Sequence, residues 1–110
     1  MHELSVAESL ADAALEHAAG RRIEALTISV GLLSGVYADS LAFYLQLLFE
    51  DRGLAAPRLD LQSPPARCRC ECGLEHGLAR AMDPCPSCGG HRRKVLEGRD
   101  CQLLSMEVES

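Results

Sequence analysis

Six cysteines carry the clearest chemical signal in this 110-residue sequence, and five of them fall in two short clusters. In CPSCGG, Cys85 and Cys88 stand three positions apart, and the glycines that follow allow a tight turn that directs backbone N–H groups at sulfur. Zn²⁺ prefers four such ligands in a tetrahedron, and a distant second pair completes the set. Twelve residues separate Cys72 from Cys85, a length suited to a zinc-ribbon loop. The spacing therefore predicts a four-cysteine zinc site.

The first cluster, CRCECG, is irregular. Cys72 precedes a glycine as Cys88 does, so we take Cys72 as a ligand. Its partner is Cys70, through a C-x-C spacing, or Cys68, through a C-x-x-x-C spacing. The shorter turn favours Cys70, and Cys68 stays open as the alternative. Four thiolates leave no coordination position for substrate or water, so we expect a structural zinc and no enzyme activity.

The first three residues, Met1-His2-Glu3, form a second set of donors. The α-amine of Met1, the backbone nitrogen of His2 and the His2 imidazole can close a five-membered and a six-membered chelate ring. Glu3 can add its amide nitrogen or its carboxylate. Nitrogen donors in one plane suit Ni²⁺ or Cu²⁺, and the need to deprotonate an amide predicts binding that weakens steeply in acid. By themselves these residues favour an ordinary helix start, because a glutamate in the first turn complements the helix dipole.

The other metal-ligating and basic residues have simpler interpretations. Because the cysteines already satisfy zinc, we expect His76 and His91 to be exposed loop residues. Cys101 is expected to be a small residue within a strand. The basic run HRRK at 91–94 favours a solvated face, and it is the surface that an acidic partner would meet.

The elements around these groups follow from apolar periodicity. Apolar residues at spacings of three and four predict a helix over 3–19. Alternation of apolar and polar residues predicts strands at 24–32, 57–62 and 102–109. A second helix, over 40–52, is apolar nearly all round, and we therefore expect it to be the most buried helix.

From 67 to 99 the apolar periodicity is lost, and Cys, Gly, Pro, Arg and His dominate. Such a segment needs a staple to hold a fold. We therefore expect a nickel-binding α/β domain over 1–66, completed by a C-terminal strand at 100–110, and a zinc-binding module over 67–99. The predicted fold class is α+β, with two helices packed on a three-stranded, mainly antiparallel sheet and an inserted four-cysteine zinc-ribbon module.

Composition and charge restrict the possible function classes. Apolar residues make up 47% of the chain, and 11 basic against 16 acidic residues give a net charge of −5. This charge argues against a nucleic-acid binder. The start of the chain lacks a signal-peptide pattern, and the apolar run from Leu41 to Phe49 is far shorter than the roughly 20 residues that span a bilayer. We therefore expect a cytoplasmic protein without a membrane segment, whose cysteines bind metal rather than form disulfides.

Five stretches together resemble one family, in order and over the whole length: MHELS, ISVGLLSGV, LAFYL, CPSCGG and LLSMEVE. They are similar to the hydrogenase nickel incorporation proteins of the HypA/HybF type. The resemblance implies a metallochaperone that delivers Ni(II) for maturation of NiFe-hydrogenase, and of urease in some organisms. It implies nickel ligation by His2 with contributions from Met1 and Glu3, and a structural four-thiolate zinc. The implied partners are a nickel-handling GTPase of the HypB type and the hydrogenase large subunit, with the chain itself a monomer or weak homodimer.

The first cysteine cluster departs from the family's pattern, because CRCEC stands where C-x-x-C is expected. This departure leaves open which cysteines of the first cluster bind zinc, but it does not affect the prediction of a zinc site. The alternative function is a zinc-ribbon adaptor that binds protein or nucleic acid through the basic loop 91–94, with an inert N-terminus. Net acidity and the scarcity of aromatic residues weigh against its nucleic-acid form.

Overall fold

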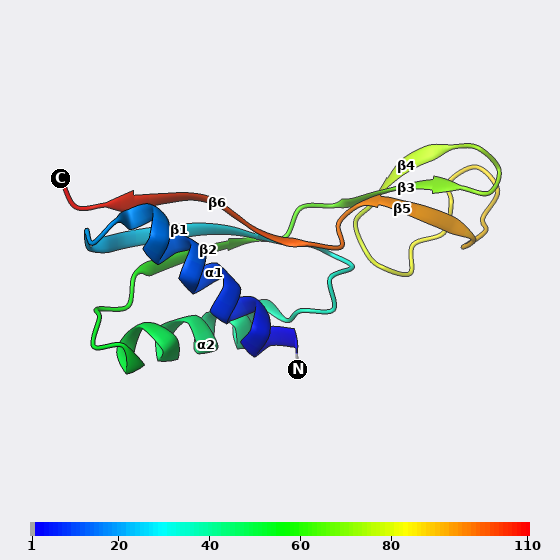
Figure 1. Ribbon diagram of the computed structural model, residues 1–110. Coiled ribbons are helices and arrows are strands. Elements are labelled where there is room, and N and C mark those ends of the chain that lie inside the picture. Colours follow the sequence, from blue (N-terminus) through cyan, green and yellow to red (C-terminus); the bar gives the residue numbers. More distant parts are fainter. Residues whose placement is uncertain (1) are drawn as a thin grey trace.

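The computed structural model describes residues 2–110 as two helices and two small sheets (Figure 1). The first sheet has the strand order β2-β1-β6 and the second has the order β4-β3-β5. The molecule is elongated, about 52 × 28 × 17 Å, with the second sheet at one end (Figure 1). Neither helix of the described residues is long and apolar enough to cross a membrane. The elements are α1 (His2–Ala18), β1 (Ile23–Val30), α2 (Ala38–Asp51), β2 (Arg58–Gln62), β3 (Ala66–Cys70), β4 (Glu75–Leu78), β5 (Arg93–Glu97) and β6 (Cys101–Val108).

β1 is the central strand of the first sheet. It pairs in parallel with β2 and antiparallel with β6. Because α2 connects β1 to β2 and crosses back along the sheet, β2 runs in the same direction as β1. The predicted arrangement of two helices on a three-stranded sheet with an inserted cysteine module is confirmed. The sheet itself is mixed, with one parallel and one antiparallel pair, rather than mainly antiparallel.

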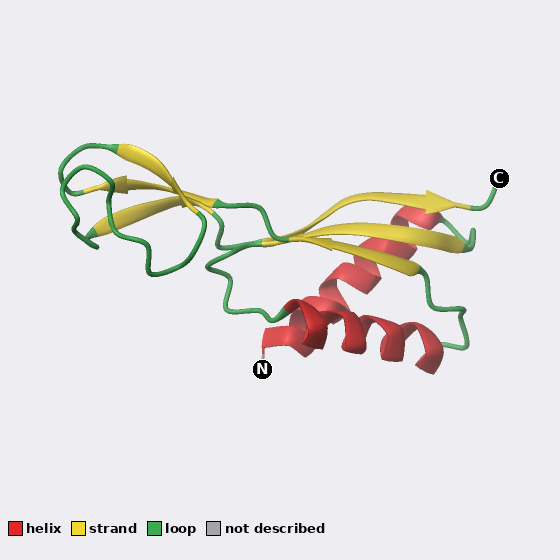
Figure 2. Ribbon diagram, turned by 180° about the vertical axis from the view of Figure 1, so that it is seen from behind, coloured by secondary structure: helices red, strands yellow, loops and turns green. Residues whose placement is uncertain are grey.

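Both helices cover the same face of the first sheet and leave the other face open (Figure 2). Alanines at helical spacing line the inner side of α1, so its backbone can lie close to the sheet and to α2. Burial of the larger apolar side chains of this core stabilises the fold by about 1.5–3 kcal/mol for each. The buried residues of the core are Ala7, Leu10, Ala11, Ala14, Ala18, Ile23, Leu26, Ile28, Val30, Leu41, Leu45 and Phe49.

α2 is buried on one side only. Leu41, Leu45 and Phe49 face the core and are at most 2% exposed. On the outer side, Phe43 is 59% exposed and Leu47 is 48% exposed. α1 contributes five buried residues to the core and α2 only three, so the expectation that α2 is the most buried helix is wrong. A helix packed on one face of a sheet can turn only one of its two apolar stripes towards the core.

The chain crosses itself closely where the first sheet meets the second. Just after β1, the Gly31 N–H donates to the Asp100 carbonyl oxygen at 3.0 Å. Two residues later, the Leu33 N–H donates to the Gly98 carbonyl oxygen at 2.8 Å. These bonds tie the connection after β1 to the segment between β5 and β6.

The second sheet has a very small core, made of Ala66, Cys68 and Leu78. Leu32 and Leu33, from the connection after β1, pack against it. The second sheet therefore takes part of its apolar contact from outside its own strands. A core of this size needs a further source of stability.

A side chain at Gly31 would meet the backbone on the opposite side of this crossing. An added Cβ would lie 2.4 Å from the Gly98 carbonyl oxygen and 2.6 Å from that of Asp100. We expect Gly31→Ala to lower the free energy of unfolding by about 2 kcal/mol, because overpacking costs about 1–3 kcal/mol. Gly77→Ala is the matched control, since its Cβ would meet nothing closer than 3.7 Å. Urea denaturation compares the two variants, and equal stability would contradict a tight crossing.

Candidate metal centre

Four cysteine sulfurs meet at the far end of the second sheet. They belong to Cys70, Cys72, Cys85 and Cys88, and all lie within 4.8 Å of one another. The Sγ atoms of Cys70 and Cys88 are 3.5 Å apart, and those of Cys72 and Cys85 are 3.7 Å apart. Four sulfurs bound tetrahedrally at about 2.3 Å from Zn²⁺ would be about 3.8 Å apart. The donor type and the spacing therefore fit a four-thiolate zinc.

Two glycine-containing turns bring these sulfurs together. Cys70 ends β3, and the turn that follows has Gly73 at a φ of 97°, which a residue with a side chain rarely adopts. The Gly73 N–H donates to the Cys70 carbonyl oxygen at 2.9 Å. In the second turn, the Gly90 N–H donates to Cys88 Sγ at 3.4 Å. The second turn thus directs a glycine N–H towards sulfur, as the sequence predicted, whereas in the first turn the glycine N–H bonds a carbonyl oxygen.

Backbone donors give the thiol of Cys85 a lower pKa than those of Cys72 and Cys88. The Cys88 N–H is the main cause that lowers the pKa of Cys85, to about 6. At Cys72 the Leu74 N–H lowers the pKa, but the thiol of Cys70, followed by burial and the other thiols, raises it to about 11. Cys85 therefore favours the thiolate form at neutral pH, whereas the raised pKa values of Cys72 and Cys88 mean that a bound metal must displace their protons. Binding of a metal is favoured as the pH rises and is lost in acid, when the Cys85 thiolate is protonated.

Cys68 lies apart from this cluster, in the core of the second sheet. Its side chain is fully buried, and its Sγ is 3.4 Å from Nε2 of His76. His76 is only 9% exposed, and its Nδ1 is 3.1 Å from the Gly77 carbonyl oxygen. The expectation that His76 is an exposed loop residue is therefore wrong. The sequence left Cys68 and Cys70 as alternatives, and of the two it is Cys70 that joins the other three cysteines.

Half of the basic run 91–94 is tied to the loop that precedes the second pair of cysteines. The Arg93 guanidinium donates to the carbonyl oxygens of Asp83 and Ala81, at 2.6 and 3.2 Å. His91 is exposed, as expected, and its Nε2 is 3.1 Å from the Met82 carbonyl oxygen. These bonds hold the loop against β5. Two of the four residues of the run, which the sequence assigned to a solvated face, thus serve the internal structure.

The predicted nickel ligands stand at the start of α1. Met1 and the side chain of His2 lie outside the described residues. The Glu3 carboxylate accepts a hydrogen bond from the Tyr37 N–H at 3.3 Å, which ties the first turn of α1 to the start of α2. The first four N–H groups of a helix have no acceptor within it, so the Glu3 N–H has none in α1.

A family model described as "Hydrogenase/urease nickel incorporation, metallochaperone, hypA" matches residues 1–108. This chain belongs to the HypA family. The match confirms the resemblance inferred from the sequence motifs. HypA proteins are nickel metallochaperones of hydrogenase maturation rather than enzymes, so the expectation of a protein without catalytic activity is confirmed at the level of the family.

Individual HypA proteins are similar over the full length. The hydrogenase maturation factor HypA of Geobacter metallireducens is 36% identical over 110 residues, which cover 99% of this chain and 100% of that protein. HypA of Methanothermobacter thermautotrophicus is 33% identical over 121 residues, with 99% and 98% covered. The solution structure of the Ni metallochaperone HypA from Helicobacter pylori covers 98% of this chain and 97% of that chain, with a TM-score of 0.69 at 23% identity. At this identity the structural likeness supports the shared HypA fold.

The sulfur cluster predicts which cysteines retain zinc. Substitution of a residue that only supports a metal ligand typically weakens metal binding by about 10–100-fold. A serine at position 70, 72, 85 or 88 removes a thiolate ligand itself, so we expect a larger loss of zinc affinity. Cys68→Ser is the matched control and should keep zinc, since Cys68 lies outside the cluster. Zinc per chain is measured by elemental analysis after dialysis against a chelator. Loss of zinc in Cys68→Ser with retention in Cys70→Ser would reverse the assignment.

Proposed function

We propose that this protein binds Ni(II) at its N-terminus through Met1, His2 and Glu3 and delivers it for maturation of NiFe-hydrogenase. Urease is a second class of recipient. The observation that carries the proposal is the family match, which extends over residues 1–108 and therefore includes the Met1-His2-Glu3 terminus. The Helicobacter pylori protein with a similar fold is itself described as a Ni metallochaperone.

The proposed nickel site uses nitrogen donors that lie close together in the sequence. The α-amine, the His2 backbone nitrogen and the His2 imidazole form two fused chelate rings, which suit the planar coordination that Ni²⁺ accepts. Since the amine, the imidazole and the amide must all lose protons to bind, nickel is held at neutral pH and released in acid. A chelate of this kind leaves the metal at the surface of the protein, where another protein can reach it.

We propose that the cysteine cluster holds zinc as a structural ion. Cys70, Cys72, Cys85 and Cys88 supply four thiolates, and their geometry supports tetrahedral binding. Bound zinc would link the β3–β4 turn to the loop before β5. Because the second sheet has a core of three buried residues, this link is its main source of stability.

Nickel delivery requires protein partners. We propose a nickel-handling GTPase of the HypB type as one partner and the hydrogenase large subunit as the other, with this chain acting as a monomer or weak homodimer.

We propose that the protein works in the reducing cytoplasm. None of its six cysteines forms a disulfide within the described residues, which supports this location.

Nickel titration tests the terminus directly. We expect roughly one nickel per chain when the native N-terminus is free, and none in His2→Ala or in a chain with an N-terminal extension, because both remove donors of the chelate. His17→Ala is the matched control, since His17 is an exposed histidine elsewhere on α1. Zinc content, measured in the same samples, should stay unchanged. Full nickel binding by the extended chain would contradict the proposal.

The role of Glu3 needs a separate experiment, because its amide nitrogen and its carboxylate are both possible donors. We infer that the amide nitrogen binds, since the carboxylate is engaged with the Tyr37 N–H. Glu3→Gln keeps an oxygen for this bond, so its nickel affinity should stay within about tenfold of the native value, the smallest effect typical of an outer contact. Competition with a chromophoric chelator measures the affinity. A loss beyond about 100-fold would instead assign the carboxylate as a ligand.

A further inference from the structure

The outer side of α2 carries an apolar ridge, which we define as Phe43, Tyr44 and Leu47. Phe43 and Leu47 lie one helical turn apart and are 59% and 48% exposed. The rings of Phe43 and Tyr44 meet edge to face, with their centroids 5.5 Å apart. Large apolar side chains that are exposed side by side mark an interaction site on a folded protein.

The core of the first sheet does not use Phe43 or Leu47. Leu41, Leu45 and Phe49 already fill the inner side of α2 and are almost fully buried. Phe43 and Leu47 lie on the opposite side of the helix, away from these buried residues, while Tyr44 at the edge of the ridge is half-buried and also packs against the core. Within the described residues, no other part of the chain covers Phe43 or Leu47 fully, and about half of each side chain stays exposed. The ridge is therefore a surface without a partner in the described chain.

Acidic side chains border the ridge at both ends. Asp39 precedes Phe43 by four positions, and Glu50 and Asp51 follow Leu47 by three and four positions, so all lie on the same face of the helix. The three carboxylates are exposed. None of them takes part in the ion pairs of the described residues. We call these three residues the acidic rim.

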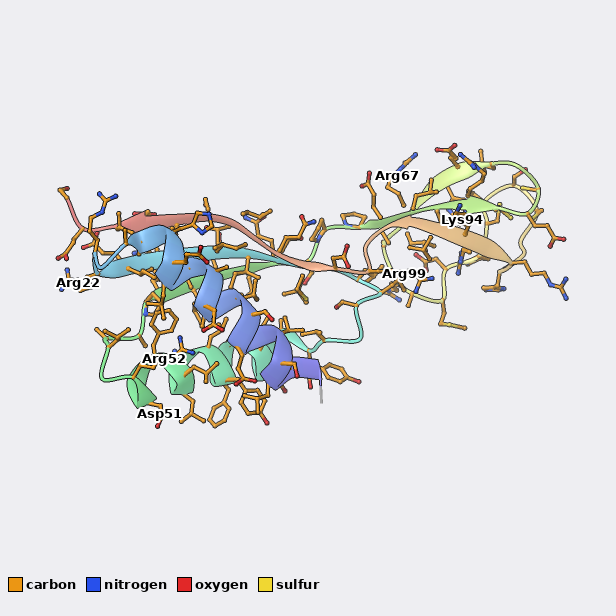
Figure 3. The ribbon with its side chains drawn as sticks, in the orientation of Figure 1. Arg22, Asp51, Arg52, Arg67, Lys94 and Arg99 are labelled. Carbon is orange, nitrogen blue, oxygen red and sulfur yellow. The ribbon has the colours of Figure 1, made fainter. Side chains whose placement is uncertain are left out.

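The nearest basic residue does not neutralise the rim. Arg52 follows α2 directly, but its Nη2 donates to Asp12 of α1 at 2.9 Å. Figure 3 shows the difference: Asp51 lies on the side of α2 away from α1, and Arg52 reaches towards α1. The ridge and its rim thus form an apolar strip with three negative charges and no positive one.

We propose that this strip is the docking surface for a partner protein that presents apolar side chains flanked by Arg or Lys. Two copies packed ridge to ridge would bring six carboxylates into one interface, and like charges brought together in an interface cost several kcal/mol. An anionic membrane or a nucleic acid would be repelled for the same reason. A basic protein surface gains from both the apolar ridge and the acidic rim.

The strip begins next to the proposed nickel terminus. Tyr37, which directly precedes α2, is 76% exposed, and its N–H donates to the Glu3 carboxylate at 3.3 Å. A protein that covers the outer face of α2 therefore reaches the first turn of α1. This placement rests on the proposed function, and it makes the strip the surface by which a nickel donor or acceptor would approach the terminus.

Binding measurements with purified partners test the proposal. The probes are the HypB-type GTPase and the hydrogenase large subunit of the same organism, each titrated against the full zinc-loaded chain by biolayer interferometry. We expect Phe43→Ser with Leu47→Ser to weaken binding of at least one probe by about tenfold or more, as truncation of central apolar contacts does. Lysines in place of the acidic rim should slow association and reduce its dependence on salt.

A matched control keeps the result specific to the strip. Leu104→Ser with Met82→Ser removes two side chains that are also exposed, at 50% and 78%, but that lie on β6 and in the loop before Cys85. This control should bind within about threefold of the native chain. Circular dichroism and zinc content establish that all variants are folded. Equal effects of the ridge variant and the control would overturn the proposal, as would unchanged binding of both probes.

Nickel content and self-association separate this inference from the proposed function. The ridge variant should bind as much nickel as the native chain, since neither substituted residue belongs to the terminus. If His2→Ala binds nickel normally while the ridge variant loses its partner, the nickel site fails and the docking surface stands. A homodimer that sedimentation detects in the native chain and not in the ridge variant would make a second copy the occupant and overturn the proposal. Failure of the native chain to bind either probe would overturn it as well.

Discussion

The meeting of four cysteine sulfurs within 4.8 Å is the interaction on which the second sheet depends. Three short strands, one tight turn and one long loop surround a core of three buried residues, which is too little apolar burial to order so much backbone. Four thiols so close together favour a divalent cation, because once they ionise their charges repel each other strongly. Zinc bound to a structural site of this type contributes on the order of 10 kcal/mol. This one centre fixes the turn after β3 and the loop before β5. Arg93 also holds that loop through two hydrogen bonds.

A single connection links the metal end of the molecule to the helical end. Residues 31–37 follow β1 and lead into α2. At one end Leu32 and Leu33 pack into the core of the second sheet, and at the other end Tyr37 is hydrogen-bonded to Glu3. Between the two sheets, the close crossing at Gly31 leaves no room for a side chain. The second sheet therefore cannot shift far against the first without a change in this connection, which also supports the start of α1.

Residue patterns predicted most of the elements, because each helix or strand has to turn an apolar face to the core. They also predicted the cysteine cluster, since the glycines next to Cys72 and Cys88 indicated the turns. Other features were not predicted, and three of them have a clear physical reason. The direction of β2 depends on the path of the α2 crossover rather than on its own residues. The strand β3 was missed because its buried positions, such as Cys68, are cysteines flanked by arginines. Both apolar stripes of α2 looked equally fit for burial, and only the packed sheet decides that Phe43 stays outside.

Charge is distributed unevenly along the chain, and this asymmetry links the proposed cargo to the proposed docking surface. Residues 67–99 hold seven basic and four acidic side chains, whereas the rest of the chain holds four basic and twelve acidic ones. Acidic groups lower the energy of a divalent cation over a distance of about 8 Å at physiological salt, so those near the start of α1 favour the approach of Ni²⁺. The same carboxylates disfavour an acidic protein and a second copy of the helical end. A basic partner that docks on α2 would neutralise part of this field, and nickel held nearby would then be bound less tightly. If nickel binds at the terminus and a basic partner docks on α2, as proposed, electrostatics alone would couple docking to the release of nickel.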